Sequence, residues 1–388
     1  MTRPIHQLLA VLRTDAPPPV DPTRSWNDIV VTAIVVGLAP VLHQRLLDAA
    51  ADVPAPAMAK LHLIRQATGE RNRAIQQQLF EIVHALQTAG VQAMVLKGAY
   101  LSAAVYPTPD LRGMSDIDLL FRPDDLPAAE QVLQNLGYEG KHKSADSGPG
   151  ITKHTSTYKR PTPAAETPNP YLSTTADRHV DPHGSLEECW FGLCTDMTPG
   201  VWERAVPHRV LEAPAWALAP NDLYLHLSIH LIYHLLMGKP SFVQLYDVST
   251  VSRFYGAALD WDWLVARSNA IGATAFLAAA NQLAVQVLGA SIPAAPQMQL
   301  LGALPRGLAD YITHLGLDDV IELSQRPPIT SLGQRLQRGL SERHATARWA
   351  TSWSGKWAVW RTALAFTHTD TGQLLAQRVR PAGAVPAE

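Results

Sequence analysis

The chain has 388 residues, of which 47% are hydrophobic and 17% are charged. This composition is typical of a globular protein that is large enough to form two or three lobes with buried cores. The formal net charge of -2 at pH 7 provides no overall attraction for a polyanion, so it disfavours long DNA or RNA as a partner.

The cysteine content and the hydropathy of the chain bear on its location. Cys189 and Cys194 are the only cysteines, too few for a disulfide framework or a thiolate metal site, so we expect reduced thiols and a cytoplasmic protein. The first residues lack the pattern of a signal peptide. The longest apolar run, residues 29–42, is too short to cross a bilayer, so we expect no transmembrane segment.

The N-terminal region, residues 1–75, is predicted to be helical. Apolar residues recur at three- and four-residue spacing in residues 26–51 and 57–88, which is typical of amphipathic helices. The second of these helices would lead into a central region, residues 76–215.

The central region changes to short apolar runs separated by turns, which indicates β-strands. We predict strands at residues 94–96, 117–121 and 179–183, and a helix at residues 126–136. Residues 140–178 are dense in proline, serine, threonine and lysine. This segment is predicted to be a long mobile loop or an irregular hairpin, and a long loop beside a site often acts as a lid.

The remaining residues, 216–388, are predicted to form a C-terminal helical lobe, with helices at residues 222–237, 261–288 and 298–314. A series of tryptophans follows at helical spacing: Trp349, Trp353, Trp357 and Trp360. Such a stripe is compatible with a membrane surface or a partner helix. Large aromatic residues at this spacing more often belong to a core, so we expect these rings to cover the helical lobe.

A pair of aspartates marks the candidate active site. Alternate residues of a strand face the same side, so Asp116 and Asp118 would present their carboxylates together. Two adjacent acids repel each other and call for a cation, and their hard oxygen ligands favour Mg²⁺. Upstream, Gly98 between a strand and a helix would let the backbone approach a phosphate, and Lys97 would add a positive charge.

Asp181 is the candidate for a third acid in the site. A further carboxylate near the metal can both bind it and accept the proton of an attacking hydroxyl. His183 would share the face of Asp181 in a regular strand, where it would either orient Asp181 or pack in the core. Pro182, which has no N–H to donate, indicates an edge strand or a strand end.

Three histidines offer a different chemistry. His226, His230 and His234 have the i, i+4 spacing of zinc ligands on a helix. Leucines flank them throughout, and no glutamate lies within the H-x-x-x-H turns to act as a base. We therefore expect packing or a substrate contact in preference to a zinc hydrolase site, with His230 as the expected contact.

The motifs together resemble the uncharacterised nucleotidyltransferase family of the polymerase-beta-like nucleotidyltransferase superfamily. The resemblance covers roughly residues 70–290. It rests on Leu96-Lys97-Gly98, Tyr106-Pro107, Arg112, Asp116-Ile117-Asp118-Leu119-Leu120, Gly137-Tyr138, Asp181-Pro182-His183, Asp222-Leu223, His226, His230, His234 and Leu245-Tyr246-Asp247. It implies an α+β fold in which a small mixed sheet is flanked by N-terminal and C-terminal helical lobes.

The resemblance also implies specific roles for the residues of the site. Mg²⁺ and a nucleoside triphosphate would bind between the glycine bend and the acidic strand. The expected catalytic and metal-binding residues are Asp116, Asp118 and Asp181, and the expected nucleotide contacts are Lys97, Gly98, Ser102 and Arg112.

The chain departs from the family pattern at the phosphate turn. Relatives usually have Gly-Ser or Gly-Gly there, whereas this chain has Gly98-Ala99. No hydroxyl that could contact a phosphate is then next to Gly98, and Ser102 lies one helical turn later. Arg112 has an alternative role, because an arginine before an acidic pair often forms a salt bridge.

The function implied is Mg²⁺-dependent transfer of a nucleoside monophosphate from a nucleoside triphosphate onto a hydroxyl, with release of pyrophosphate. The acceptor is an unidentified small molecule, peptide or protein. The departure at the turn keeps open a non-catalytic nucleotide-binding or partner-binding module with the same fold.

Overall fold

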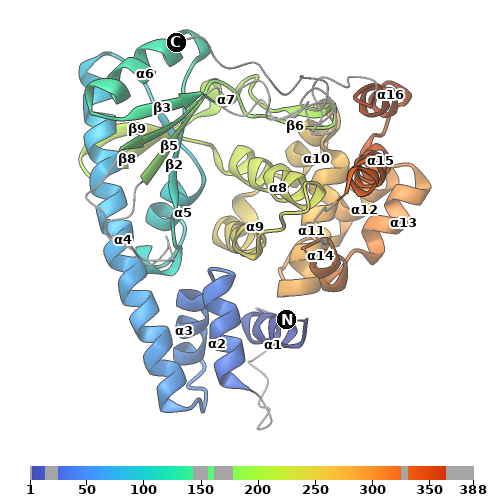
Figure 1. The fold of residues 1–388 in the computed structure, drawn as a ribbon, viewed down its shortest axis with the longest axis horizontal. Coiled ribbons are helices and arrows are strands. Elements are labelled where there is room, and N and C mark those ends of the chain that lie inside the picture. The colour runs from blue at the N-terminus through green and yellow to red at the C-terminus, as the bar shows by residue number, and fades with distance from the viewer. Residues whose placement is uncertain (1, 14–24, 143–155, 161–177, 325–330, 364–388) are drawn as a thin grey trace, which may run out of the picture.

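The computed structural model describes residues 2–13, 25–142, 156–160, 178–324 and 331–363. Within these residues the chain forms a mixed β-sheet surrounded by helices, which confirms the predicted α+β class. Figure 1 shows α4 (Ala55–Thr88) running from the N-terminal helices to the sheet, with most of the C-terminal helices on the other side of the molecule.

In the part of the chain that the structure describes, three short helices precede α4; the second and third pack against α4, and the first packs against those two. They are α1 (Thr2–Leu12), α2 (Trp26–Val35) and α3 (Ala39–Asp48). The helical pattern at residues 26–51 is divided at Gly37, whose φ of 75° lies in the left-handed region that glycine adopts without strain.

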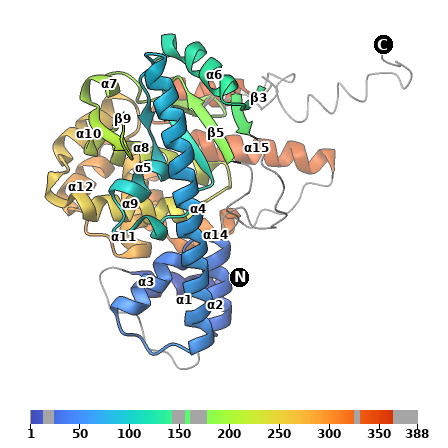
Figure 2. The same cartoon turned by 90° about the vertical axis from the view of Figure 1, so that its left-hand side faces the viewer.

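Helix α4 connects these helices to the sheet. It contacts α2 and α3 near its start and β8 and β9 further along, and Figure 2 shows it facing the viewer along its length. The boundary expected at residue 75 falls inside this helix. The N-terminal helices and the sheet therefore share one continuous support.

Within the described residues the main sheet has seven strands in the order β3-β4-β5-β2-β1-β9-β8. The strands are β1 (Met94–Val95), β2 (Asp116–Leu120), β3 (Glu139–His142), β4 (Ser156–Arg160), β5 (Arg178–His183), β8 (Val206–Val210) and β9 (Ala213–Ala217). The predicted strands at residues 94–96, 117–121 and 179–183 correspond to β1, β2 and β5. Ile117, Leu119 and Val180 are fully buried, and this apolar burial fixes which side of β2 and β5 faces the core.

The position of Pro182 fits its missing N–H. Strand β5 lies between β2 and β4, but β4 pairs only with residues 178–180 of β5. Pro182 therefore has a neighbouring strand on the β2 side alone, which is the environment that a proline in a strand requires.

Part of the segment expected to be a loop or hairpin belongs to the sheet. Strands β3 and β4 pair with each other antiparallel, and β4 pairs antiparallel with β5. Residues 143–155 and 161–177, and with them the expected lid, lie outside the described residues. The helix predicted at residues 126–136 is α6 (Leu126–Asn135), preceded by the 3-10 helix η2 (Pro123–Asp125).

The C-terminal lobe is helical, as predicted. It comprises α8 (Pro220–Leu236), α9 (Phe242–Tyr255), η3 (Gly256–Ala258), α10 (Trp261–Ala270), α11 (Thr274–Leu288), α12 (Ala294–Gly302), α13 (Arg306–His314), α14 (Leu317–Ser324), α15 (Leu332–Trp349) and α16 (Trp353–Arg361). The short helix α7 (Val201–Arg204) belongs to the central region and precedes β8. The helix expected at residues 261–288 is divided at Gly272, which has a φ of 71°, and the one at residues 298–314 is divided before Pro305. In the described part of the chain, no helix has both the length and the apolarity that crossing a bilayer requires.

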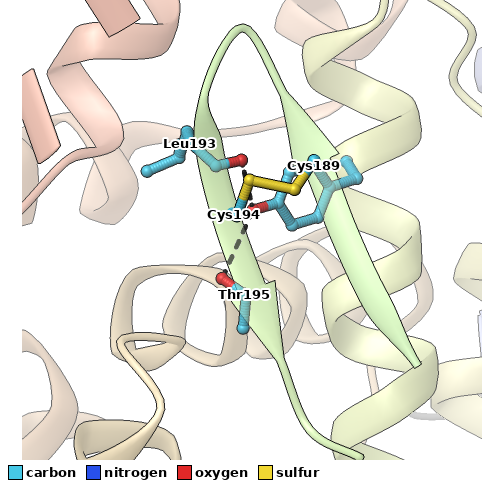
Figure 3. The surroundings of a disulfide bond; sticks show 5 residues. Cys189, Leu193, Cys194 and Thr195 are labelled. Carbon is cyan, nitrogen blue, oxygen red and sulfur yellow. Dashed lines mark hydrogen bonds between the residues drawn. A yellow bond between two sulfur atoms is a disulfide. The ribbon is translucent and has the colours of Figure 1, made fainter. Parts of the chain in front are cut away.

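Both cysteines lie in a separate hairpin formed by β6 (Glu187–Trp190) and β7 (Leu193–Asp196) (Figure 3). Its turn residues Phe191 and Gly192 have φ values of 45° and 76°, as in the two-residue turns that favour tight hairpins. This turn sets Cys189 opposite Cys194 with their Cα atoms 4.1 Å apart, and the structure joins them by a disulfide.

The expectation of two reduced thiols is therefore wrong. A count of cysteines does not reveal that a two-residue turn brings this particular pair face to face. The cysteine content accordingly no longer argues for a reducing compartment.

A buried ion pair connects the loop before β2 to the helical lobe. Arg112 donates from Nε to Oδ1 of Asp247 in α9 at 2.9 Å and from Nη2 to Oδ2 at 2.8 Å. The hydroxyl of Tyr106 donates to the same carboxylate at 2.8 Å. Burial disfavours the charged form of Arg112, but the attraction of Asp247 outweighs it and raises the pKa of Arg112, so the pair stays ionised.

Replacing Asp247 with alanine should lower the free energy of unfolding by about 3–5 kcal/mol, because a buried guanidinium would lose its partner. The matched control is Glu81→Ala, which removes the partly exposed pair of Glu81 with Arg160 and should cost at most about 1 kcal/mol. Urea denaturation of both variants measures the difference. Equal losses of unfolding free energy in the two variants would show that the Arg112–Asp247 pair stabilises the fold no more than the Glu81–Arg160 pair does.

Candidate functional site

Three carboxylates lie on one face of the paired strands β2 and β5. The strands run parallel, with Asp118 opposite Asp181 and Asp116 opposite His179. Asp116 and Asp118 are two residues apart in β2, so both project from the face that also carries Asp181. The sequence therefore predicted the shared face of the β2 pair correctly, and the strand register adds Asp181 to it.

Lys97 approaches these acids from the bend between β1 and α5 (Lys97–Ala104). Its Nζ lies 2.8 Å from Oδ1 of Asp118, and both side chains are largely buried. Lys97 has a φ of 44°, a left-handed conformation that is costly for a residue with a Cβ and is found disproportionately at functional sites. The strained backbone at Lys97 thus places its ammonium group at the acidic face.

His183 binds the same oxygen of Asp118. Its Nε2 lies 2.8 Å from Oδ1, and the imidazole is buried. Burial lowers the pKa of His183 despite this hydrogen bond, and the charge of Lys97 lowers it further. The imidazole is therefore neutral near pH 7 and donates its Nε2 proton to the ionised carboxylate.

The two aspartates of β2 have pKa values shifted in opposite directions. Burial raises the pKa of Asp116 to about 6, and the negative charges of Asp118 and Asp181 add to the rise. Burial acts to raise the pKa of Asp118 too, but Lys97 and His183 outweigh it and hold that pKa well below the usual range. One acid of the pair is therefore firmly ionised and the other is poised to bind a proton or a cation.

The donor set of this face fits a hard divalent cation. Carboxylate oxygens are the ligands that Mg²⁺ prefers, and the raised pKa of Asp116 indicates an excess of negative charge that a cation would relieve. The oxygens of Asp116, Asp118 and Asp181 do not all lie within 4.8 Å of one another. In this structure Lys97 supplies the positive charge at Asp118.

The bend carries Gly98, the residue expected to admit a phosphate. A Cβ built on Gly98 would lie 3.5 Å from Nη1 of Arg112 and 3.5 Å from Cγ of Met114, which is ordinary contact. Packing within the protein alone therefore does not require glycine here.

Two expected nucleotide contacts have other partners in the structure. Ser102 is fully buried, and its hydroxyl lies 3.4 Å from the sulfur of Met114, so it packs in the core. Arg112 directs its guanidinium to Asp247 and to the carbonyl of Gly113. This is the salt-bridge role left open by the sequence, and through it Arg112 holds the loop before β2 against α9.

The histidines of α8 form a second buried cluster. The rings of His226 and His230 are 5.9 Å apart between centroids, and those of His230 and His234 are 4.4 Å apart. His230 Nδ1 lies 2.9 Å from Oε1 of Glu188 in β6. His230 thus contacts the hairpin, and its expected role as a substrate contact stays a prediction.

The structure gives no support to a zinc site on α8. Among the described residues, the grouping that brings three metal-ligating atoms within 4.8 Å is Glu187, Cys189 and Cys194, and the sulfurs of this grouping are joined to each other. The three histidines do not form such a grouping.

Residues of α4 that the sequence analysis did not identify hold the segment before β2. Arg71 donates from Nε to the carbonyl of Met114 at 2.8 Å, and Asn72 donates to the carbonyls of Pro109 and Arg112 at 2.6 and 2.7 Å. Both side chains are buried. In the sequence, Arg71 and Asn72 stand out as adjacent polar residues within an amphipathic helix. The neighbouring residues do not indicate which groups they bind.

Comparison with known proteins gives one result. The sequence model of a protein family described as uncharacterised nucleotidyltransferase matches residues 22–289, more than half of the chain. No match was found among curated proteins or among solved structures.

The opposite pKa shifts predict opposite effects of two similar substitutions. Because the folded pKa of Asp116 is raised, its ionisation destabilises the protein above about pH 6, so Asp116→Asn should raise the free energy of unfolding at pH 8 by about 1–3 kcal/mol and change it little at pH 4. Asp118→Asn should lower the free energy of unfolding at pH 8. The pKa of Asp118 is lower in the folded protein than in the unfolded one, so its ionised carboxylate stabilises the fold at pH values above the unfolded pKa, and this stabilisation is lost as the pH falls. Urea denaturation of both variants at pH 4 and pH 8 measures the signs, and like signs would contradict this electrostatic account.

Proposed function

Because the chain belongs to the nucleotidyltransferase family described as uncharacterised nucleotidyltransferase, we propose that it is a Mg²⁺-dependent enzyme of the polymerase-beta-like type. It transfers a nucleoside monophosphate from a nucleoside triphosphate onto a hydroxyl of an acceptor and releases pyrophosphate. The observation that carries this proposal is the acidic face of β2 and β5, where Asp116, Asp118 and Asp181 gather beside the Lys97-Gly98 bend.

In the proposed reaction the acceptor oxygen forms a bond to the α-phosphorus. The bond between that phosphorus and the oxygen bridging to the β-phosphate breaks, and pyrophosphate leaves with the electron pair. Asp181 takes the proton of the acceptor hydroxyl. Its place opposite Asp118 on the neighbouring strand supports this assignment, because the base must lie beside the residues that hold the phosphates.

The chain's own groups bind and orient the reactants. Asp116 and Asp118, with Asp181, would hold Mg²⁺, which when bound would neutralise charge on the phosphate oxygens. Lys97 would offer its ammonium group to the phosphates, and the backbone at Gly98 would approach them. His183 acts as a positioning residue, since its Nε2 proton fixes the orientation of Asp118.

A second candidate is a nucleotide-binding or partner-binding module without catalytic activity. Two observations favour it: Lys97 and His183 both bind Oδ1 of Asp118, and the hydroxyl of Ser102, one turn after Gly98 in α5, is buried. Such a module would bind Mg²⁺ and a nucleoside triphosphate without forming pyrophosphate.

The acceptor in the catalytic proposal is a small molecule, a peptide or a protein, in agreement with the small net charge.

The combined variant Asp116→Asn, Asp118→Asn should lose at least about a thousandfold in pyrophosphate release, because carboxylate ligands to a catalytic cation would be gone. The assay incubates the protein with each labelled nucleoside triphosphate, Mg²⁺ and a cell extract, and follows both pyrophosphate and the labelled acceptor. Far-ultraviolet circular dichroism checks that the fold persists.

The matched control is Asp124→Asn with Asp125→Asn, two carboxylates of η2 that follow the same strand. This control should keep wild-type activity. Activity in the Asp116/Asp118 variant equal to that of the wild type would rule out the proposed mechanism. Nucleotide binding by the wild type without pyrophosphate release would favour the non-catalytic module.

Gly98→Ala separates ligand approach from folding. Its added methyl makes only ordinary contacts within the protein, and alanine is favoured over glycine in a helix by about 0.5–1 kcal/mol, so the free energy of unfolding should stay the same or rise. Affinity for a nucleoside triphosphate with Mg²⁺, measured by titration calorimetry, should fall by about tenfold, the effect of roughly one lost close contact. Gly302→Ala in α12, where a Cβ meets nothing within 4 Å, is the control. Unchanged affinity in Gly98→Ala would remove the bend from the nucleotide site.

A further inference from the structure

A basic pocket lies between α13, α15 and α16, outside the residues that the family model matches. Its volume is about 610 Å³, and its walls include Leu308, His344, Arg348, Lys356 and Trp360. Among the residues that the structure describes, those that line it include no aspartate or glutamate. Figure 1 shows these helices at the side of the molecule away from α4.

The tryptophans beside this pocket differ sharply in burial. Trp349 is buried, as expected for a residue that covers the lobe, whereas Trp353, Trp357 and Trp360 are 87%, 62% and 37% exposed. The expectation that the whole stripe belongs to the core is therefore wrong beyond Trp349. The four tryptophans do not share one helix, because α15 ends at Trp349 and α16 begins at Trp353, and α16 turns its indoles outward.

Positive charge accompanies the exposed indoles. Lys356 lies over the ring of Trp353 at 5.4 Å and also lines the pocket. Arg361 follows Trp360 and is exposed, and the sequence of α16 contains no acidic residue. The face thus joins aromatic side chains to cations within one helix.

We propose that this face docks on a membrane surface rich in anionic phospholipid. Indole side chains favour the boundary between water and acyl chains, because each has an apolar ring and a polar N–H. The charges of Arg348 and Lys356 complement the phosphate of a headgroup that enters the pocket, and its volume exceeds that of a phosphate alone. A short helix with tryptophans and lysine or arginine fits binding in the plane of the interface.

The test is co-sedimentation of the full chain with phosphatidylcholine vesicles that contain or lack phosphatidylglycerol. We expect binding to vesicles with phosphatidylglycerol, weakened by added salt because surface charges are screened, and little binding to phosphatidylcholine alone. Trp353→Ser with Trp357→Ser should weaken binding by about tenfold or more, the effect of removing two indoles from the interface.

Matched control variants test whether vesicle binding depends on this face or on exposed apolar and charged side chains in general. Leu63→Ser with Met298→Ser removes equally exposed apolar side chains elsewhere and should leave vesicle binding unchanged. Arg348→Gln with Lys356→Gln should abolish the preference for phosphatidylglycerol, whereas Lys239→Gln with Arg253→Gln, which are exposed on other elements, should not.

Several results would overturn the proposal. They are no binding of the wild type to phosphatidylglycerol vesicles, equal losses in the control variants, or a dimer in gel filtration that the tryptophan variants convert to a monomer. The last result would assign the face to a second copy of the chain. Circular dichroism and pyrophosphate release without vesicles should be the same in all variants, so the outcome is independent of the proposed nucleotidyl transfer.

Discussion

The parallel pairing of β2 with β5 is the constraint on which the candidate site depends. It places Asp118 opposite Asp181, and Asp118 in turn receives Lys97 from the β1–α5 bend and His183 from the end of β5. Three segments that are distant in sequence therefore meet at one carboxylate oxygen. A shift of one residue in this register would turn the acids toward the core, where Ile117 and Val180 now pack. The burial of those apolar side chains thus specifies the chemistry on the opposite face.

Local sequence patterns predicted the elements of this site because the patterns have a direct geometric meaning. The period of two in Asp116 and Asp118 identified their common face, and the strand pattern around Asp181 identified β5. Residues whose role depends on distant partners were not predictable in the same way. Asp247 lies 135 residues from Arg112, and the burial of Ser102 follows from packing against Met114. No pattern within either segment encodes such a contact.

In the helical regions, too, sequence patterns predicted the elements but not their contacts with the rest of the protein. Periodicity located the helices, and the breaks at Gly37 and Gly272 follow from the left-handed backbone that those glycines adopt. Spacing alone does not tell which face of a helix meets the rest of the protein, so Trp349 was expected in the core correctly and Trp353 was not. The cysteines posed a similar problem, since their pairing depends on the turn conformation at Phe191 and Gly192.

The pair formed by Arg112 and Asp247 has a mechanical consequence. It fastens the loop that leads into β2 to α9 of the helical lobe, and Tyr106 reinforces the same carboxylate. If the helical lobe moved away from β2 at this point, the charged side chains of Arg112 and Asp247 would lose each other as partners in an apolar environment. Separating the loop from α9 would therefore require breaking this buried pair, so we expect the two segments to move together.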